Sequence, residues 1–154
     1  MTSNKTEILV LGIGNILLGD EGIGVHAVRM LEQNDWPAHI RFLDGGTGGF
    51  HLLSVFRQYQ TIILVDACLD GNKAGQVNLL KPKYAADFPQ TLSAHDIGLK
   101  DLIYSSALLG YLPEIYLVTV SINPGQPMSM ELSPEAGNSL EQIEKIVGEL
   151  VRTL

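Results

Sequence analysis

The residues best suited to chemistry lie in a glycine-rich stretch near the start of the chain, from Leu11 to Gly24. An apolar run precedes it and an amphipathic stretch follows it, which predicts a strand, a loop and a helix in that order. In parallel sheets such a loop places a ligand at the carboxyl end of the strand. The acidic pair Asp20 and Glu21 stands where the helix begins, a place that phosphate-binding loops keep free of negative charge. The stretch therefore predicts a site for a cation.

Two further side chains complete a ligand set with Glu21. Asp66 ends a buried apolar strand, and His95 falls in the first turn of a later predicted helix. Two carboxylates and an imidazole suit a divalent transition metal such as nickel or zinc, and three protein ligands leave positions open for water or substrate. Each residue also has an ordinary explanation. Glu21 can favour a helix dipole, Asp66 can cap a turn, and His95 can be a surface residue.

A fourth candidate, Asp44, ends another predicted strand and precedes a second glycine-rich loop, residues 45–49. Right-handed crossovers place the loops that follow parallel strands along one edge of a sheet. We therefore expect Glu21, Asp44 and Asp66 on the same rim. His95 joins them if the loop before its helix folds back over that edge.

Hydrophobic patterning predicts the elements that must position these residues. The predicted strands are residues 7–11, 40–44, 61–67, 76–80 and 115–122. The predicted helices are residues 22–33, a segment after Gly49, a helix ending near Leu109 and a last helix that Ser133 caps. Ser93 and Asp96 resemble a capping box at the start of the third helix. The small residues Gly22 and Gly24 would let the first helix pack close to the strands.

This alternation indicates a three-layer α/β fold: a mostly parallel, five-stranded twisted sheet with helices on both faces. The link between strands 61–67 and 76–80 is too short for a helical crossover, so strand 76–80 is expected to be antiparallel and at a sheet edge. The chain has 154 residues, of which 45% are hydrophobic and 18% charged, as in globular proteins. We expect one domain, residues 1–154.

Composition also restricts partners and compartment. The net charge of −7 argues against nucleic acid or an anionic membrane as a partner, although it is also an ordinary solubility feature. The sequence shows no signal-peptide pattern and no apolar run long enough to span a membrane, so a cytoplasmic protein is expected. The single cysteine, Cys68, excludes an internal disulfide and a cysteine-rich zinc site.

Other kinds of site are weaker matches. Gly12 and Gly14 begin like a dinucleotide-binding motif with Asp44 as the ribose ligand, but Leu17 stands where the third glycine belongs and Glu21 would repel a pyrophosphate. No serine-hydrolase elbow or zinc-protease helix motif is present. Cys68 facing His95 as a nucleophile is a further alternative, but a lone cysteine at this place is more often a small buried apolar residue.

Four motifs together resemble the hydrogenase maturation endopeptidases, which remove the C-terminal tail from the large subunit of nickel–iron hydrogenases. The similarity covers nearly the whole chain, with the motifs in the family's order and spacing, although the last third matches mainly in pattern. The motifs are the stretch from Leu11 to Gly24, Leu43-Asp44-Gly45-Gly46-Thr47, Val65-Asp66-Ala67, and Ser93-Ala94-His95-Asp96-Ile97-Gly98-Leu99.

The resemblance implies roles for the candidate residues. The metal-contacting residues of the family fall on Glu21, Asp66 and His95, and the family's second-loop aspartate falls on Asp44. The expected reaction is an aspartic-type hydrolysis of one peptide bond near the C-terminus of a nickel-loaded precursor. Nickel is expected to arrive with the substrate as a recognition tag, and no organic cofactor is expected. Apart from this resemblance, we expect the protein to be a monomer in solution.

Two mechanisms and a second function remain open. The metal polarises the scissile carbonyl or activates water, or else it only positions the tail while Asp44 or Glu21 acts as general base. The candidate catalytic residues are therefore Asp44, Glu21 and Asp66. Alternatively, the protein is a metal-sensing or chaperone module that docks on the precursor without cutting it. The loops at residues 83–92 and 123–130 are expected to border the cleft and to influence partner choice.

Overall fold

A computed structural model describes residues 7–49, 51–89, 92 and 97–154. Within these residues one sheet has the strand order β2-β1-β3-β5-β4. Four strands are mutually parallel and β4 is antiparallel to β5 at the edge, as predicted. The strands are β1 (Ile8–Gly12), β2 (Ile40–Asp44), β3 (Thr61–Cys68), β4 (Val77–Leu80) and β5 (Glu114–Ser121).

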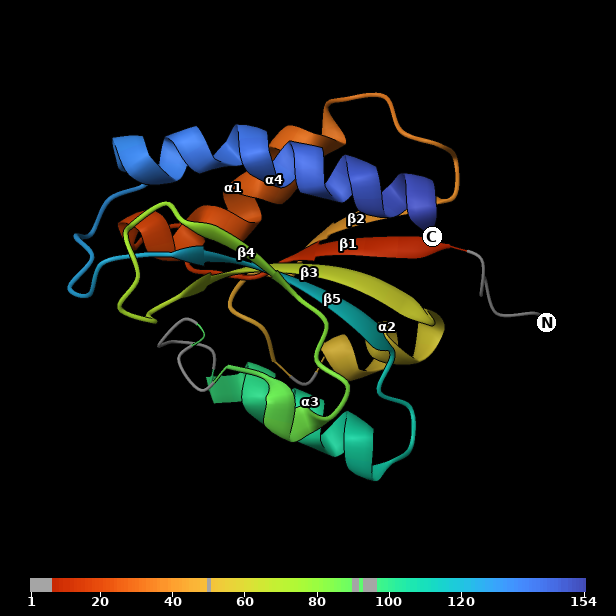
Figure 1. Cartoon of the computed structure of the whole chain (residues 1–154). Helices are drawn as coiled ribbons and strands as arrows, with labels where there is room; N and C mark the ends of the chain where they lie inside the picture. Colours follow the sequence, from red (N-terminus) through yellow and green to blue (C-terminus); the bar gives the residue numbers. More distant parts are fainter. Residues whose placement is uncertain (1–6, 50, 90–91, 93–96) are drawn as a thin grey trace.

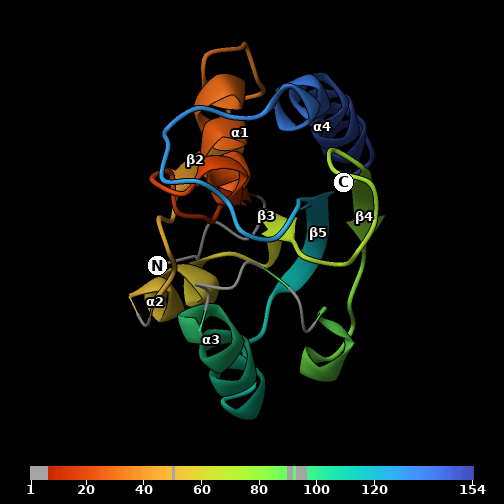
Figure 2. The ribbon, with the colours of Figure 1, turned by 90° about the vertical axis from the view of Figure 1, so that its left-hand side faces the viewer.

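Helices cover both faces of the sheet, which confirms the predicted three-layer arrangement (Figure 1). Helices α1 (Ile23–Glu32) and α4 (Pro134–Thr153) lie on one face, and α2 (Leu52–Gln58) and α3 (Ile97–Leu108) lie on the other (Figure 2). Two short 3₁₀ helices are η1 (Gly19–Gly22) and η2 (Ala85–Asp87), the latter inside the stretch predicted as loop. The predicted capping box at Ser93 and Asp96 lies outside the described residues.

Alternating side chains along β3 divide the core in two. Ile63 and Val65 pack with α1 and α4, whereas Ile62 and Leu64 pack with the opposite cluster, which includes residues of α2 and α3. Successive side chains of a strand point to opposite faces. Asp66 continues the second series, so it points to the face that α2 and α3 cover.

The same parity places Asp44 on the other face. Ile40 and Phe42 of β2 pack with α1 and α4, so Asp44, the next residue in this series, points toward α1. Along the strands, Asp44 is level with Gly12, and Gly12 is level with Val65. The two aspartates thus reach the same edge of the sheet on opposite faces.

The first turn of α1 lies directly against the strand ends because Gly24 has no side chain. A Cβ atom built on Gly24 would be 2.3 Å from the carbonyl oxygens of both Ile13 and Val65. These are backbone atoms, so they cannot move aside as a flexible side chain would. The prediction that small residues let the helix pack closely is confirmed, and η1 is consequently fixed at the carboxyl edge of the sheet.

We predict that Gly24→Ala lowers the free energy of unfolding by at least about 2 kcal/mol, because the added methyl group must push α1 away from β1 and β3. Gly137→Ala is the matched control, since Gly137 lies in the first turn of α4 with open space around its Cβ position. That substitution should raise stability by about 0.5–1 kcal/mol. Urea unfolding of both variants measures the difference, and equal stabilities would refute the close-packing explanation.

Candidate active site at the carboxyl edge of the sheet

Backbone hydrogen bonds join the ends of the three parallel strands that carry the candidate residues. The Gly14 N–H donates to the Gly46 carbonyl at 2.7 Å, and the Gly45 N–H donates to the Gly12 carbonyl at 2.8 Å. The Ile13 N–H donates to the Val65 carbonyl at 3.0 Å. The two glycine-rich loops are therefore held together as one surface beside the end of β3.

Glu21 is buried in η1, which packs against β3. Gly14 makes this placement feasible, because a Cβ atom there would be 2.2 Å from the Glu21 carbonyl oxygen. Asp66 is fully buried in β3, and its Oδ1 accepts the Ala67 N–H at 2.8 Å. Burying a charged carboxylate costs free energy, and ionisable groups buried at such a cost are found most often at functional sites. Oxygen-rich buried positions of this kind can hold a cation.

His95, the third predicted ligand, lies outside the described residues. Nearby, Leu92 forms an antiparallel bridge with Cys68, so the chain passes the end of β3 shortly before His95. Cys68 itself is buried, as expected for a small apolar residue. Among the residues that the structure describes, no three His, Cys, Asp or Glu side chains form a group that could hold a metal ion. The three-ligand set thus stays a prediction.

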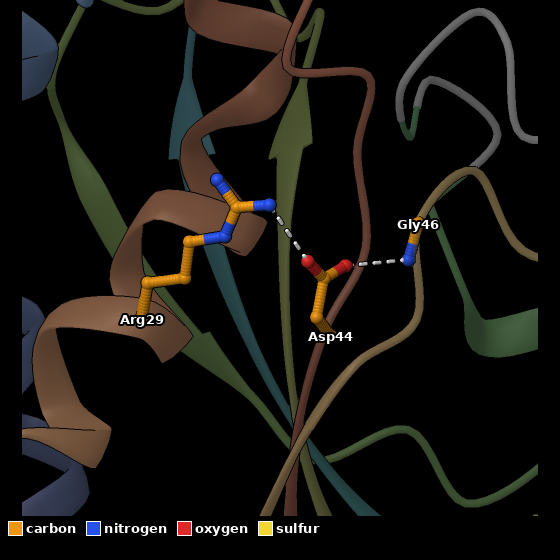
Figure 3. Close-up of polar contacts among 3 residues, drawn as sticks. All are labelled: Arg29, Asp44 and Gly46. Atoms are coloured by element: carbon orange, nitrogen blue, oxygen red, sulfur yellow. Dashed lines mark hydrogen bonds and ion pairs between the residues drawn. The ribbon is translucent and has the colours of Figure 1, made fainter.

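Asp44 is exposed and held from two sides (Figure 3). Its Oδ2 accepts from the Arg29 guanidinium at 3.2 Å, and its Oδ1 accepts the Gly46 N–H at 2.9 Å. Arg29 belongs to α1, which agrees with the parity of β2. Asp44 therefore shapes the second glycine-rich loop, while its exposed carboxylate stays accessible from the solvent at the sheet edge.

Asp20 has a role that its sequence position did not indicate. Its carboxylate accepts the Ser133 N–H at 2.8 Å and the Ser133 hydroxyl at 2.6 Å, and its own N–H donates to Gln126 Oε1 at 2.8 Å. Ser133 also caps α4 by accepting the Ala136 N–H. The two acidic residues therefore have different positions: Asp20 anchors η1 to the start of α4, whereas Glu21 is buried near the strand ends. Because the partners are 113 positions apart in the sequence, no local pattern could reveal this contact.

His26 is a histidine in α1 that belongs to none of the candidate sites predicted from the sequence. Burial, followed by the neighbouring Arg29 charge, lowers the pKa of His26, and the Asp20 charge opposes this only in part. The imidazole is therefore neutral at physiological pH. It adds no positive charge to the acidic edge.

Comparison with known proteins decides the family. A sequence model of the hydrogenase maturation proteases matches residues 25–150. The chain belongs to the hydrogenase maturation protease family. The chain is accordingly an endopeptidase, a hydrolase of peptide bonds. Family membership favours this activity over the alternative of a module that docks on the precursor without cutting it. The match includes Asp44, Asp66 and His95 and begins after Glu21.

Individual relatives agree with this family. The chain is 36% identical to the hydrogenase expression/formation protein HupD of Rhodobacter capsulatus over 96% of its length and 70% of that protein's. It is 34% identical to the hydrogenase 2 maturation protease of Escherichia coli over 88% of its length and 87% of that protein's.

Solved structures share the fold. The hydrogenase maturating endopeptidase HybD of E. coli superimposes with a TM-score of 0.85 at 34% identity, covering 96% of this chain and 93% of that one. The nickel–iron hydrogenase maturation protease HybD of Thermococcus kodakarensis gives a TM-score of 0.76 at 27% identity, covering 94% and 99%. The expected α/β architecture and family are both confirmed.

The interaction energy between Asp20 and Ser133 can be measured by a double-mutant cycle. We predict that Asp20→Ala and Ser133→Ala each destabilise the fold, and that the double variant loses about 1–3 kcal/mol less than the sum of the two losses, because both remove the same charge-assisted hydrogen bonds. Chemical unfolding of the four proteins gives the coupling energy. Strictly additive losses would show that the two residues act independently.

Proposed function

We propose that this protease removes the C-terminal extension of a nickel–iron hydrogenase large-subunit precursor after nickel insertion. The observation that carries the proposal is the burial of two carboxylates, Glu21 and Asp66, at the carboxyl edge of the sheet in a chain of this family. Glu21, Asp66 and His95 would contact the nickel ion that the precursor brings. A precursor without nickel would lack this anchor and bind poorly, which makes nickel loading a condition for cleavage.

The proposed ligands, Glu21, Asp66 and His95, suit a metal ion that binds together with the substrate and is released with the product. Two carboxylates and one imidazole leave coordination positions free for the ligands that the precursor itself supplies. Whether the ion also activates the scissile bond or only positions it, the protein must supply a proton acceptor or orient the attacking water. Asp44 and Glu21 are the candidate bases. Asp44 is the one that solvent reaches directly, whereas Glu21 is buried.

The compartment, oligomeric state and cofactor requirement are also part of the proposal. No helix within the described part of the chain is long and apolar enough to cross a bilayer. We propose that the protease works in the cytoplasm, as a monomer and without an organic cofactor. Its only macromolecular partner in this proposal is the precursor, because a net charge of −7 disfavours nucleic acid and anionic lipid.

We predict that Glu21→Gln, Asp66→Asn and His95→Ala each abolish tail removal from a nickel-loaded precursor, because each removes one ligand of the ion. The wild-type protein should shorten the nickel-loaded precursor and leave the nickel-free precursor intact. Intact mass measurement of the precursor reports both results. Glu114→Gln is a suitable control, since it removes an exposed carboxylate at the opposite end of the parallel strands. Normal processing by the His95 variant would disprove the ligand assignment.

The role of Asp44 can be separated from that of its ion pair. We predict that Asp44→Asn stops cleavage, because asparagine keeps the acceptor for the Gly46 N–H but cannot take up a proton. Arg29→Gln should retain most of the activity, because exposed ion pairs contribute only about 0–1 kcal/mol. Initial cleavage rates and precursor affinity are measured for both variants. If Arg29→Gln is as inactive as Asp44→Asn, the ion pair and not the base is essential.

A further inference from the structure

The loop after β1 and the loop after β5 are joined by a short parallel bridge between Leu18 and Ser129. The Gly19 N–H donates to the Ser129 carbonyl at 2.8 Å, and the Ser129 N–H donates to the Leu17 carbonyl at 2.9 Å. Leu17, Met128 and Met130 flank the two bridged residues, so they lie close to one another where the two loops meet.

These three flanking side chains are strongly exposed. The exposed fractions are 54% for Leu17, 87% for Met128 and 59% for Met130, whereas Leu18 and Ser129 are only half-exposed. Single exposed apolar residues are ordinary, but three large ones close together mark an interaction surface. We call Leu17, Met128 and Met130 the apolar platform.

The apolar platform is continuous with the candidate active site. Gly19, which is hydrogen-bonded to Ser129, is the first residue of η1, the helix that holds Glu21. The Asp20 N–H donates to Gln126, in the same loop as the two methionines. The apolar platform therefore lies beside the loop that carries Glu21. The occupant that catalysis itself brings to this place is the substrate.

We propose that the apolar platform binds an apolar segment of the hydrogenase precursor that flanks the scissile bond. This inference rests on the proposed function and adds to it the chemistry by which the precursor's chain is held. Methionine suits such a role because its unbranched, polarisable side chain adapts to different apolar partners. A precursor bound through its nickel ion alone would be free to rotate about that point, and a second contact fixes the direction of its tail.

The test compares Met128→Gln/Met130→Gln with the matched double variant Leu108→Gln/Leu109→Gln. The exposed fractions of Leu108 and Leu109, 87% and 61%, are similar to those of the two methionines; Leu108 is the last residue of α3 and Leu109 follows it. We expect the methionine variant to raise the KM for nickel-loaded precursor about tenfold, with kcat little changed. The leucine variant should match the wild type. Binding of the same precursor to Asp44→Asn proteins with and without each double substitution gives a readout that needs no cleavage.

The outcomes separate the two proposals. An unchanged KM and unchanged binding in the methionine variant, while the wild type processes precursor, would overturn the platform but not the proposed function. A wild type that binds precursor through the platform without shortening it would overturn the proposed function but not the platform. Equal losses in both double variants would show a general effect of surface polarity, and a wild-type dimer that the methionine variant dissolves would identify a second copy as the occupant. Either result would overturn the inference.

Discussion

The structure depends on the direct contact between the start of α1 and the backbone of β1 and β3. Gly24 allows this contact, since any side chain there would strike two carbonyl oxygens. With α1 fixed against the strands, the loop that precedes it has little freedom and folds into η1 at the edge of the sheet. Hydrogen bonds between the two glycine-rich loops then complete that edge. The geometry of backbone atoms, more than that of side chains, determines where Glu21 lies.

The acidic residues at this edge of the sheet have different structural roles although they are neighbours. Asp20 is satisfied by Ser133 and gives the fold a link between its first loop and its last helix. Asp44 is paired with Arg29 on the face that α1 covers. Glu21 and Asp66 are buried near the ends of β1 and β3. Charge alone would group all four, but their contacts and the faces on which they lie distinguish them.

Much of the fold followed from local patterns in the sequence. The apolar runs of β1 and β3, the short link to β4 and the Ser133-Pro134 helix start all predicted elements that the structure contains. The family was evident from four motifs, and the comparisons confirmed it. The features that sequence patterns did not predict depend on contacts between residues far apart in the chain, or on the face of the sheet to which a strand residue points. The bonds of Asp20 to Ser133 and the opposite faces of Asp44 and Asp66 required knowing which elements lie side by side, and the position of His95 lies outside the described residues.

The link between Asp20 and Ser133 also bears on when the enzyme becomes competent during its synthesis. Ser133 is made 113 residues after Asp20, so these hydrogen bonds form only after most of the chain has left the ribosome. Until then η1 lacks the partner that holds it to the start of α4. A nascent chain that contains Glu21, Asp44 and Asp66 but ends before Ser133 therefore holds these acidic residues without the contact that anchors η1.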